Sequence, residues 1–463
     1  MSADFVPSGP IEEIAARLER LPTTRFTWRI VTLGSLAFVI ESLSIGAMGV
    51  VLPVLKGAWA LSSGMIGLLA VSSTIGIIVG LIPAGRLADR YGRKAVLFWG
   101  IIEYSALTML AALSPNYRWL LAIRFLSGLG MGAVFPMPYS IISEFVPSDR
   151  RTLFNGVMDS ALSAGYFLAP LFGLAILPRL APDLSWRIFF LTSGIPLIFA
   201  FLIRRYLPES PRWLVRSGHQ ERAFSVMTNI EREVSRGLGR PLPPPQTKPV
   251  PVPTAPRDYN LLSPWRRAHL RRTVVLASAA IGTFFMFYIV MTYLPLIFSK
   301  QGFVFAQSLW FTAIITAAAI PGKLLNGWLG ESLGRKWMYV LFMVVAGAGA
   351  LFFGFARTAP LMIFYGCVMS FFGTGTFPVL KIAYSEQYPT LIRTTGAATV
   401  ETLGRLFGGV VGPYAFPALI TAAGLGASFD LVAVVAFLAV VIMLLFGQES
   451  KQQSLEALEA KLG

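Results

Sequence analysis

Long uninterrupted runs of apolar residues follow one another along most of the chain, with short polar stretches between them. About 20 apolar residues in a helix cross the hydrocarbon core of a bilayer. The runs are continuous and do not alternate between apolar and polar residues, which favours helices over the strands of a barrel. We therefore predict twelve membrane-spanning helices, at residues 29–54, 62–85, 95–113, 119–142, 152–177, 186–206, 272–298, 306–329, 337–356, 360–384, 395–420 and 428–447.

The composition agrees with a membrane protein. Hydrophobic residues make up 55% of the 463 residues and charged residues 13%, whereas a soluble domain carries about 25% charged residues. The single cysteine, Cys367, lies in the tenth predicted span, so the chain can form no internal disulfide and no cysteine-based metal site. No group of residues resembles a hydrolase triad, a metal site or a nucleotide-binding loop. We therefore expect a protein that is not an enzyme and has no cofactor.

The formal net charge of +16 is distributed unevenly along the chain. Basic residues gather in alternate loops, for example at Arg86–Lys94, at Arg150 and Arg151, and at Arg335 and Lys336. This is the positive-inside pattern of a membrane protein with both termini in the cytoplasm. Binding to nucleic acid is a poor alternative explanation, because no soluble basic domain is present to hold it.

The chain divides into five predicted parts. These are an N-terminal amphipathic segment (1–28), a six-helix bundle (29–206), a cytoplasmic linker (207–270), a second six-helix bundle (271–448) and a cytoplasmic tail (449–463). In the first part, one helical face carries Ile11, Ile14, Leu18 and Leu21. The linker combines short amphipathic helices between residues 212 and 236 with an extended proline-rich stretch at 241–256.

Two motifs occur twice, and both repeat with the same offset of 242 residues. The repeats pair Gly85–Lys94 with Gly327–Lys336, and Ser143–Pro147 and Arg151 with Ser385–Pro389 and Arg393. A single shared offset indicates a duplicated unit. In a very apolar chain, a duplicated unit indicates a transporter whose site lies between the two halves.

Three motifs together resemble the major facilitator superfamily: Gly85–Lys94, Arg124–Gly132 and Pro208–Leu214. The last is similar to the signature of the sugar-porter and organic-ion-transporter branches, and Glu449-Ser450-Lys451 resembles a weaker second copy of it. The resemblance covers nearly the whole chain. It implies an all-helical fold of two pseudo-symmetric six-helix bundles, a cavity between them and transport by alternating access. It also implies a monomer in the inner membrane of a bacterium. Within Arg124–Gly132, we expect the alternate glycines to form a helix-packing face.

Charged residues at the predicted cytoplasmic helix ends are candidates for a gate. Carboxylates and guanidinium groups there can pair across neighbouring helices when the inner side is closed and separate when it opens. The first unit supplies Asp89, Arg93, Glu144 and Arg151, and the second supplies Glu331, Arg335, Glu386 and Arg393. The alternative is that these charges only set the topology and solvate the loops.

Eight ionisable residues lie inside the predicted spans, where each costs roughly 2.5–3.5 kcal/mol on insertion scales. They are the acids Glu41, Glu103, Asp159 and Glu401 and the bases Arg124, Lys323, Lys381 and Arg405. Equal numbers of acids and bases indicate that they form ion pairs in at least one state of a transport cycle. A charged substrate or a transported proton could then break one of these pairs. Lys323 lies near a cytoplasmic helix end, where its side chain could instead reach the interface. The role of Glu103 stays open.

Glu41 is the first candidate for a proton carrier. The resemblance implies an acid in this region of the first span, and Arg124 matches the fourth-span arginine that pairs with it in the family. A desolvated carboxyl group favours its protonated form, which suits reversible protonation. The alternative for Glu41 is a fixed ion pair or a hydrogen bond. Asp159, the repeat equivalent of Glu401, is the second candidate.

Lys381 and Arg405 are candidates for binding a substrate carboxylate. Sugar porters of the superfamily carry tryptophan at the position of Lys381 and glutamine in spans five and seven, and this chain has neither. Basic residues at similar places occur in the organic-anion branch, and Gly404-Arg405 resembles a pair in niacin-carrier-like bacterial members. Glu401 either holds Arg405 toward the cavity or only neutralises it. The candidates for contact with the body of the substrate are Tyr166, Tyr288 and Tyr293.

These features predict a secondary transporter that imports a small organic anion, such as an aromatic carboxylate of the nicotinate or benzoate type, with the proton as coupling ion. Its partners would be this substrate and the lipid bilayer. Two other transport functions stay open: a proton-driven exporter of drugs or metabolites, and a sugar–proton symporter, against which the missing glutamine and tryptophan argue. A sensor without transport activity is a third alternative, although no signalling domain is visible.

Overall fold

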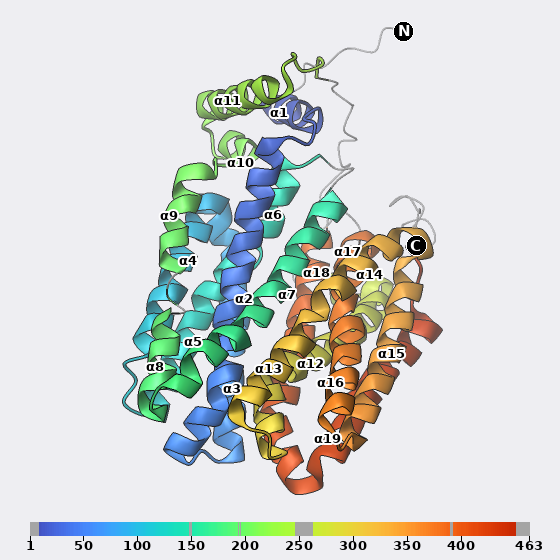
Figure 1. Cartoon of the computed structure of the whole chain (residues 1–463). Coiled ribbons are helices and arrows are strands. Elements are labelled where there is room, and N and C mark those ends of the chain that lie inside the picture. Colours follow the sequence, from blue (N-terminus) through green and yellow to red (C-terminus); the bar gives the residue numbers. More distant parts are fainter. Residues whose placement is uncertain are drawn as a thin grey trace.

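The computed structural model describes residues 9–147, 151–192, 194, 196–245, 263–388 and 392–450, and these residues form helices and the loops between them (Figure 1). The N-terminal half contains α1 (Pro10–Glu19), α2 (Arg25–Trp59), α3 (Ser63–Tyr91), α4 (Arg93–Ala111), α5 (Tyr117–Val134), α6 (Met137–Phe145), α7 (Arg151–Ile176), η2 (Leu177–Arg179), α8 (Pro182–Thr192) and α9 (Pro196–Tyr206). The connecting segment contains α10 (Pro211–Arg216), α11 (Gln220–Leu238) and η3 (Ser263–Trp265). The C-terminal half contains α12 (Arg267–Lys300), α13 (Phe305–Ala317), α14 (Ala319–Leu333), α15 (Arg335–Phe355), α16 (Ala359–Val368), η4 (Met369–Gly373), η5 (Thr374–Thr376), α17 (Phe377–Gln387), α18 (Arg393–Leu403), η6 (Gly404–Val411) and α19 (Gly412–Phe446).

Eleven helical stretches of the described chain are long and apolar enough to cross a membrane. The last of them, Thr395–Phe446, holds two of the predicted spans. Gly424 separates these two spans, because its φ of 82° and ψ of 176° are not helical. The predicted fold of twelve membrane helices in two six-helix bundles is therefore confirmed, and Figure 1 shows the two bundles side by side.

Several spans consist of two consecutive helices instead of one. A proline stands in the first turn of the second helix in each case, at Pro138, Pro196, Pro321 and Pro378. Proline has no N–H group to donate and its ring clashes with the preceding turn, so the regular hydrogen-bond ladder stops before it. In the tenth span the break is longer, because a π-helical turn (η4) and a 3₁₀ turn (η5) precede α17.

The predicted glycine packing face in the fourth span is confirmed. A Cβ atom at Gly128 would lie 2.3 Å from the Ser73 carbonyl oxygen, and one at Gly132 would lie 2.3 Å from that of Ile77. Only glycine lets α5 come this close to α3. Gly130 faces α4 instead, where the Glu103 carboxylate occupies the space of a side chain.

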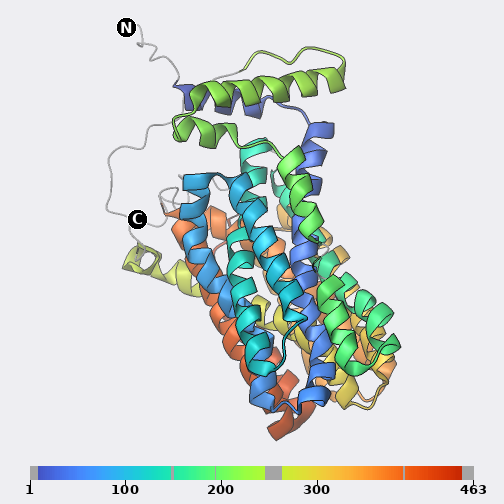
Figure 2. The same ribbon diagram turned by 90° about the vertical axis from the view of Figure 1, so that its left-hand side faces the viewer.

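The helices α1, α10 and α11 form a layer at one end of the N-terminal bundle (Figure 2), and we call this end of the molecule the terminal side. Of the residues on the predicted apolar face, Ile14, Leu18 and Leu21 are buried, whereas Ile11 is exposed. Arg17 and Arg20 both bind Glu231 of α11, at 2.6 and 2.5 Å. Burial works against the Glu231 carboxylate, but its hydrogen bonds with the two arginines outweigh burial and lower its pKa. Most of the predicted proline-rich stretch lies outside the described residues.

The two bundles pack tightly at the opposite end, which we call the distal side. A Cβ atom at Gly49 of α2 would lie 2.6 Å from the Thr292 carbonyl oxygen of α12. One at Gly67 of α3 would lie 2.2 Å from the Tyr414 carbonyl oxygen of α19. Such backbone-to-backbone contact leaves no room for a solute between the halves at these points.

Candidate functional site

Asp159 of α7 joins the two halves at membrane depth. Its Oδ1 atom lies 3.1 Å from Nζ of Lys381 on α17, and its backbone oxygen accepts a hydrogen bond of 3.0 Å from Nζ of Lys323 on α14. The Asp159 side chain is almost fully buried. A buried carboxylate with two cations from the other bundle forms a strong but breakable contact between the halves.

Tyr139 of α6 completes this cluster and was not predicted as a site residue. Its hydroxyl donates to Asp159 Oδ1 and also contacts Lys381 Nζ. Tyr139 and Lys381 are 242 residues apart, so they are equivalent positions of the duplicated unit. The sequence contained this signal, but the offset alone does not show that two equivalent residues touch.

Arg405 forms a second cluster beside the first, and the predicted grouping with Glu401 and Tyr288 is present. Its Nε and Nη2 atoms lie 3.2 and 3.1 Å from Glu401 Oε1, and its Nη1 atom lies 3.2 Å from the Tyr288 hydroxyl. Arg405 belongs to η6, a π-helical segment. Such segments are rare and occur often at functional sites.

Aromatic rings connect the two clusters. The Phe135 ring centroid lies 4.1 Å from Arg405 Cζ and 5.3 Å from Lys381 Nζ. Lys381 also lies 4.3 Å from the ring centroid of Tyr139. Two cations of the C-terminal half thus share one aromatic face of the N-terminal half. We call Asp159, Lys381, Arg405, Tyr139 and Phe135 the central cluster.

The expected pairing of Glu41 with Arg124 is absent from this structure. Arg124 Nη2 donates instead to the Ser44 carbonyl oxygen at 3.1 Å, and its Cζ lies 5.8 Å from the Phe190 ring centroid. Both Glu41 carboxylate oxygens are buried without a hydrogen-bond partner. The charges of Arg405 and Lys381 act on Glu41 through space. Glu41 therefore belongs electrostatically with the central cluster and not with Arg124.

Two of the three tyrosine predictions need comment. Tyr293 is not at the central cluster: its hydroxyl donates to the Pro413 carbonyl oxygen at 2.7 Å and its ring packs against Phe416, so it braces α12 against α19. Tyr166 packs edge-on against Phe287, with ring centroids 5.1 Å apart, at the boundary of the two halves. The charges of Arg405 and Glu41 both reach it.

The alternative that Lys323 reaches the membrane interface is wrong. Its side chain is fully buried, donates to the Asp159 backbone and lies 5.2 Å from the Phe377 ring centroid. A long cation turns inward when a buried carbonyl oxygen and an aromatic face are closer than the interface.

The predicted gate residues on the terminal side pair within each half. Arg93 Nε lies 2.8 Å from Glu144 and Nη2 lies 3.1 Å from Asp89. The second unit repeats the first pair, because Arg335 donates to both oxygens of Glu386 at 3.2 and 2.9 Å. The repeat is incomplete: Glu331 is exposed and forms no ion pair with the described residues, unlike its equivalent. The side chains of Arg151 and Arg393 lie outside the described part.

Two further carboxylates cap the helices that follow the repeated loops. Glu449 accepts from the amides of Arg335 and Lys336 at 2.8 and 3.0 Å, and Glu209 accepts from the Lys94 amide at 3.4 Å. Carboxylates at helix N-termini are stabilising. Burial raises the pKa of Glu209, and its amide hydrogen bonds oppose the shift. The Pro208–Leu214 motif thus fixes the start of α4.

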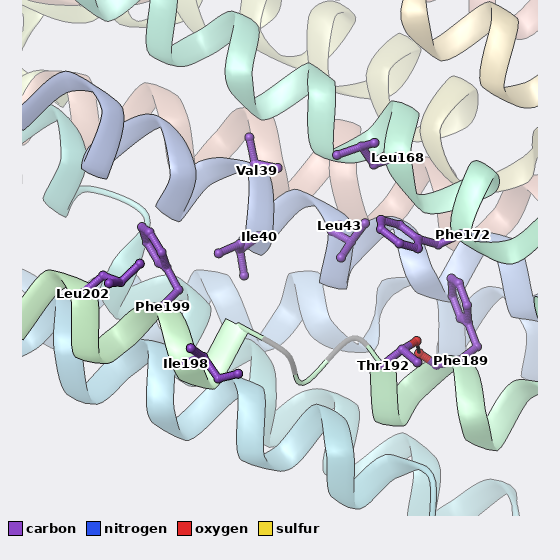
Figure 3. Close-up of a pocket in the computed structure, with 10 residues that line it drawn as sticks. All are labelled: Val39, Ile40, Leu43, Leu168, Phe172, Phe189, Thr192, Ile198, Phe199 and Leu202. Atoms are coloured by element: carbon purple, nitrogen blue, oxygen red, sulfur yellow. Dashed lines mark hydrogen bonds between the residues drawn. The ribbon is translucent and has the colours of Figure 1, made fainter. Parts of the chain in front are cut away.

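A cavity of ≈ 320 Å³ lies outside the central cluster, between α2, α7, α8 and α9 (Figure 3). Its lining is apolar except for Thr192, whose hydroxyl donates to the Phe189 carbonyl oxygen at 2.8 Å. Phe172 and Ile198 on its rim are exposed on the outer surface of the bundle. This cavity suits an acyl chain better than a charged solute.

Known proteins resemble the chain over nearly its whole length. The pattern of the Major Facilitator Superfamily matches residues 34–329 and 304–462. The chain is 30% identical to the niacin transporter NiaP of Acinetobacter baylyi, over 96% of this chain and 99% of that protein. It is 26% identical to the 4-hydroxybenzoate transporter PcaK of the same organism, over 89% of both chains. The xylose transporter XylE from E. coli, in a partially occluded inward open conformation, has a TM-score of 0.74 and 17% identity, covering 93% of this chain and 99% of that chain.

Proposed function

Because the chain belongs to the major facilitator superfamily, a family of membrane transporters, we propose that it carries a small aromatic monocarboxylate together with one proton. Niacin and 4-hydroxybenzoate, the solutes in the names of two relatives, are both aromatic carboxylic acids. The proposal names the class of solute and leaves its substituents open.

The observation that carries the proposal is the buried Arg405 beside Lys381. A guanidinium group offers a planar set of donors that matches a carboxylate. Arg405 already holds one carboxylate, that of Glu401, and it keeps a hydroxyl partner in Tyr288. The rings of Phe135 and Phe284 lie 4.1 and 5.0 Å from its Cζ, so a flat ring attached to the carboxylate would meet aromatic surface.

The charges around the central cluster support the proposed coupling to one proton. The cations are Lys323, Lys381 and Arg405, and the carboxyl groups are Glu41, Asp159 and Glu401. With all six ionised, their charges cancel. An ionised Glu41 without donors is costly in apolar surroundings, so this state favours its protonated form. One positive charge is then in excess, and one substrate carboxylate would balance it.

The packing supports an orientation for the transport cycle. The halves are in backbone contact on the distal side. The helices α1, α10 and α11 lie on the terminal side, as do the N-terminal ends of α4 and α15, which begin at Arg93 and Arg335. The positive-inside rule places the terminal side in the cytoplasm. In this assignment the structure is closed to the outside, and the contact of Asp159 with Lys381 holds the halves together at mid-depth.

Uptake into proteoliposomes tests the proposal. The full chain is reconstituted, and a pH gradient or a potassium diffusion potential is imposed separately. Nicotinate, benzoate and 4-hydroxybenzoate are compared with nicotinamide and xylose. One proton per monocarboxylate moves no net charge, so we expect accumulation with the pH gradient and none with the potential alone.

One variant and three contrary outcomes sharpen this test. Glu41→Gln should abolish accumulation driven by the pH gradient and preserve exchange of labelled for unlabelled solute. Uptake of xylose or nicotinamide at the rate of the acids would contradict the solute class. Accumulation driven by the potential would contradict the stoichiometry, and unchanged accumulation in Glu41→Gln would remove Glu41 from the proton pathway.

A further inference from the structure

A second cavity opens on the terminal side of the C-terminal half, between the ends of α12, α17 and α19. Its volume is ≈ 220 Å³, and its lining includes Arg267, Arg271, Arg272, Gln387, Phe446 and Gln448. It lies at helix ends, away from the mid-depth residues of the central cluster. Unlike the apolar cavity of Figure 3, it is lined largely by basic and amide side chains.

We propose that this cavity binds the phosphate group of an anionic phospholipid in the leaflet on the terminal side. The first argument is charge. Three guanidinium groups line a small space, and among the described carboxylates none pairs with Arg267 or Arg271. The nearby acid Glu386 is engaged by Arg335 and by the Ser450 hydroxyl. A basic pocket between membrane helices on the cytoplasmic side is a common form of lipid headgroup site.

The second argument is that the structure holds two of the three arginines in place. Arg272 Nη1 donates to the Gln387 carbonyl oxygen at 2.8 Å, and Arg271 Nε donates to the Phe446 carbonyl oxygen at 3.3 Å. The Arg271 bond uses only Nε, so its two terminal nitrogens can still donate to a phosphate. Gln387 is itself fixed, since its Nε2 atom donates to the Gln448 carbonyl oxygen at 3.1 Å.

The third argument is depth in the membrane. Large apolar residues beside the cavity are exposed on the surface: Leu270 and Val274 on α12, and Leu445 and Phe446 on α19. Each of them lines the cavity or adjoins in sequence a residue that does. In a bilayer such residues face acyl chains, and Arg267 and Arg271, in the first turns of α12, lie near the level of the headgroups. A lipid whose phosphate enters the cavity can therefore lay its chains along these residues.

Thermal unfolding of the purified full-length protein in detergent tests the proposal. Phosphatidylglycerol is added as the anionic lipid, phosphatidylcholine as the uncharged control and inorganic phosphate as the free anion. We expect phosphatidylglycerol to raise the unfolding temperature more than phosphatidylcholine, and phosphate alone to have no effect. The difference between the two lipids should fall by at least half in Arg267→Gln/Arg271→Gln.

Matched variants make the result specific. Arg86→Gln/Arg90→Gln removes the same charge from exposed positions in the last turns of α3 and should keep the full lipid effect. Arg267→Lys/Arg271→Lys keeps the charge and should keep most of the effect. An undiminished effect in the glutamine double variant, an equal loss in the Arg86→Gln/Arg90→Gln control, or an equal shift with inorganic phosphate would each overturn the proposal. Since no transport is measured, its failure is distinct from failure of the proposed function.

Discussion

Replacing Arg405 by glutamine is the most direct test of the proposed anion site. The change keeps a polar side chain of similar length but removes the charge that Glu401 and Tyr288 now hold. A hydrogen bond to a charged group contributes about 1.5–3 kcal/mol. Since about 1.4 kcal/mol corresponds to a factor of ten, loss of one such bond to the substrate should weaken binding roughly 10- to 150-fold.

The assay compares a carboxylate with its neutral amide. Binding of nicotinate and nicotinamide is measured by their inhibition of solute exchange in proteoliposomes, for the wild type and for Arg405→Gln. Nicotinamide has the same ring but no negative charge, so its affinity should change by less than about threefold, which is below 1 kcal/mol. The two ligands should therefore separate in the variant.

Glu401→Gln is the matched control, because it changes the same ion pair from the other side. It leaves Arg405 charged and removes the carboxylate that competes with the substrate. Affinity for nicotinate should stay the same or increase. The reasoning is refuted if Arg405→Gln weakens both ligands by the same factor, or if Glu401→Gln weakens nicotinate as much as Arg405→Gln does.

Three further predictions concern stability. Asp159→Asn should lower the free energy of unfolding, measured with denaturant in detergent, by about 3–5 kcal/mol, because the buried lysine charge is left uncompensated. Asp159→Asn/Lys381→Met should recover part of this loss, and a double variant no more stable than Asp159→Asn would contradict the ion pair. Gly92→Ala should lower the free energy of unfolding by about 1–3 kcal/mol, because Gly92 has φ of 92° and a Cβ atom there would lie 2.4 Å from the capping Glu209. Gly64→Ala, at a position with open space around it, is the control and should be tolerated, so equal unfolding curves for the two variants would refute this. The Glu231 carboxylate, whose pKa is lowered in the folded protein, should stabilise α1 above its unfolded pKa of about 4.3 and lose this effect as the pH falls through its lower folded value. Hydrogen exchange of α1, corrected for its intrinsic rate, should therefore rise as the pH falls below about 4.3 in the wild type and stay flat in Glu231→Gln.

Most of the fold could be predicted because a membrane leaves the chain few choices. Unsatisfied backbone groups are too costly in lipid, so each long apolar run must be a helix. The breaks within spans also have a local cause, as at Pro138 and Pro378, although neither was predicted from the sequence. The irregular turns η4 and η5 stand directly before Pro378 in the tenth span.

The residue types of the site could be predicted, but not all their partners. Charge inside a span marked Asp159, Lys381 and Arg405 without knowledge of the fold. The pairing of these charged residues depends on how the two bundles face each other, and no local sequence pattern predicts that orientation. For this reason Tyr293 was misplaced, and the sequence left open whether Lys323 is buried or reaches the interface. Tyr139 was missed because a tyrosine in an apolar span is usually a packing residue.

The duplication gives the proposed coupling of a proton and an anion a structural basis. Tyr139 in the first half and Lys381 in the second occupy equivalent positions with different chemistry, and both contact Asp159, whose own equivalent Glu401 is also an acid. The halves therefore attract each other at mid-depth through Asp159 and Lys381. In the proposed transport, a proton on Glu41 leaves one positive charge in excess among the six charged groups, and a substrate carboxylate balances that charge. Each ligand would therefore favour binding of the other.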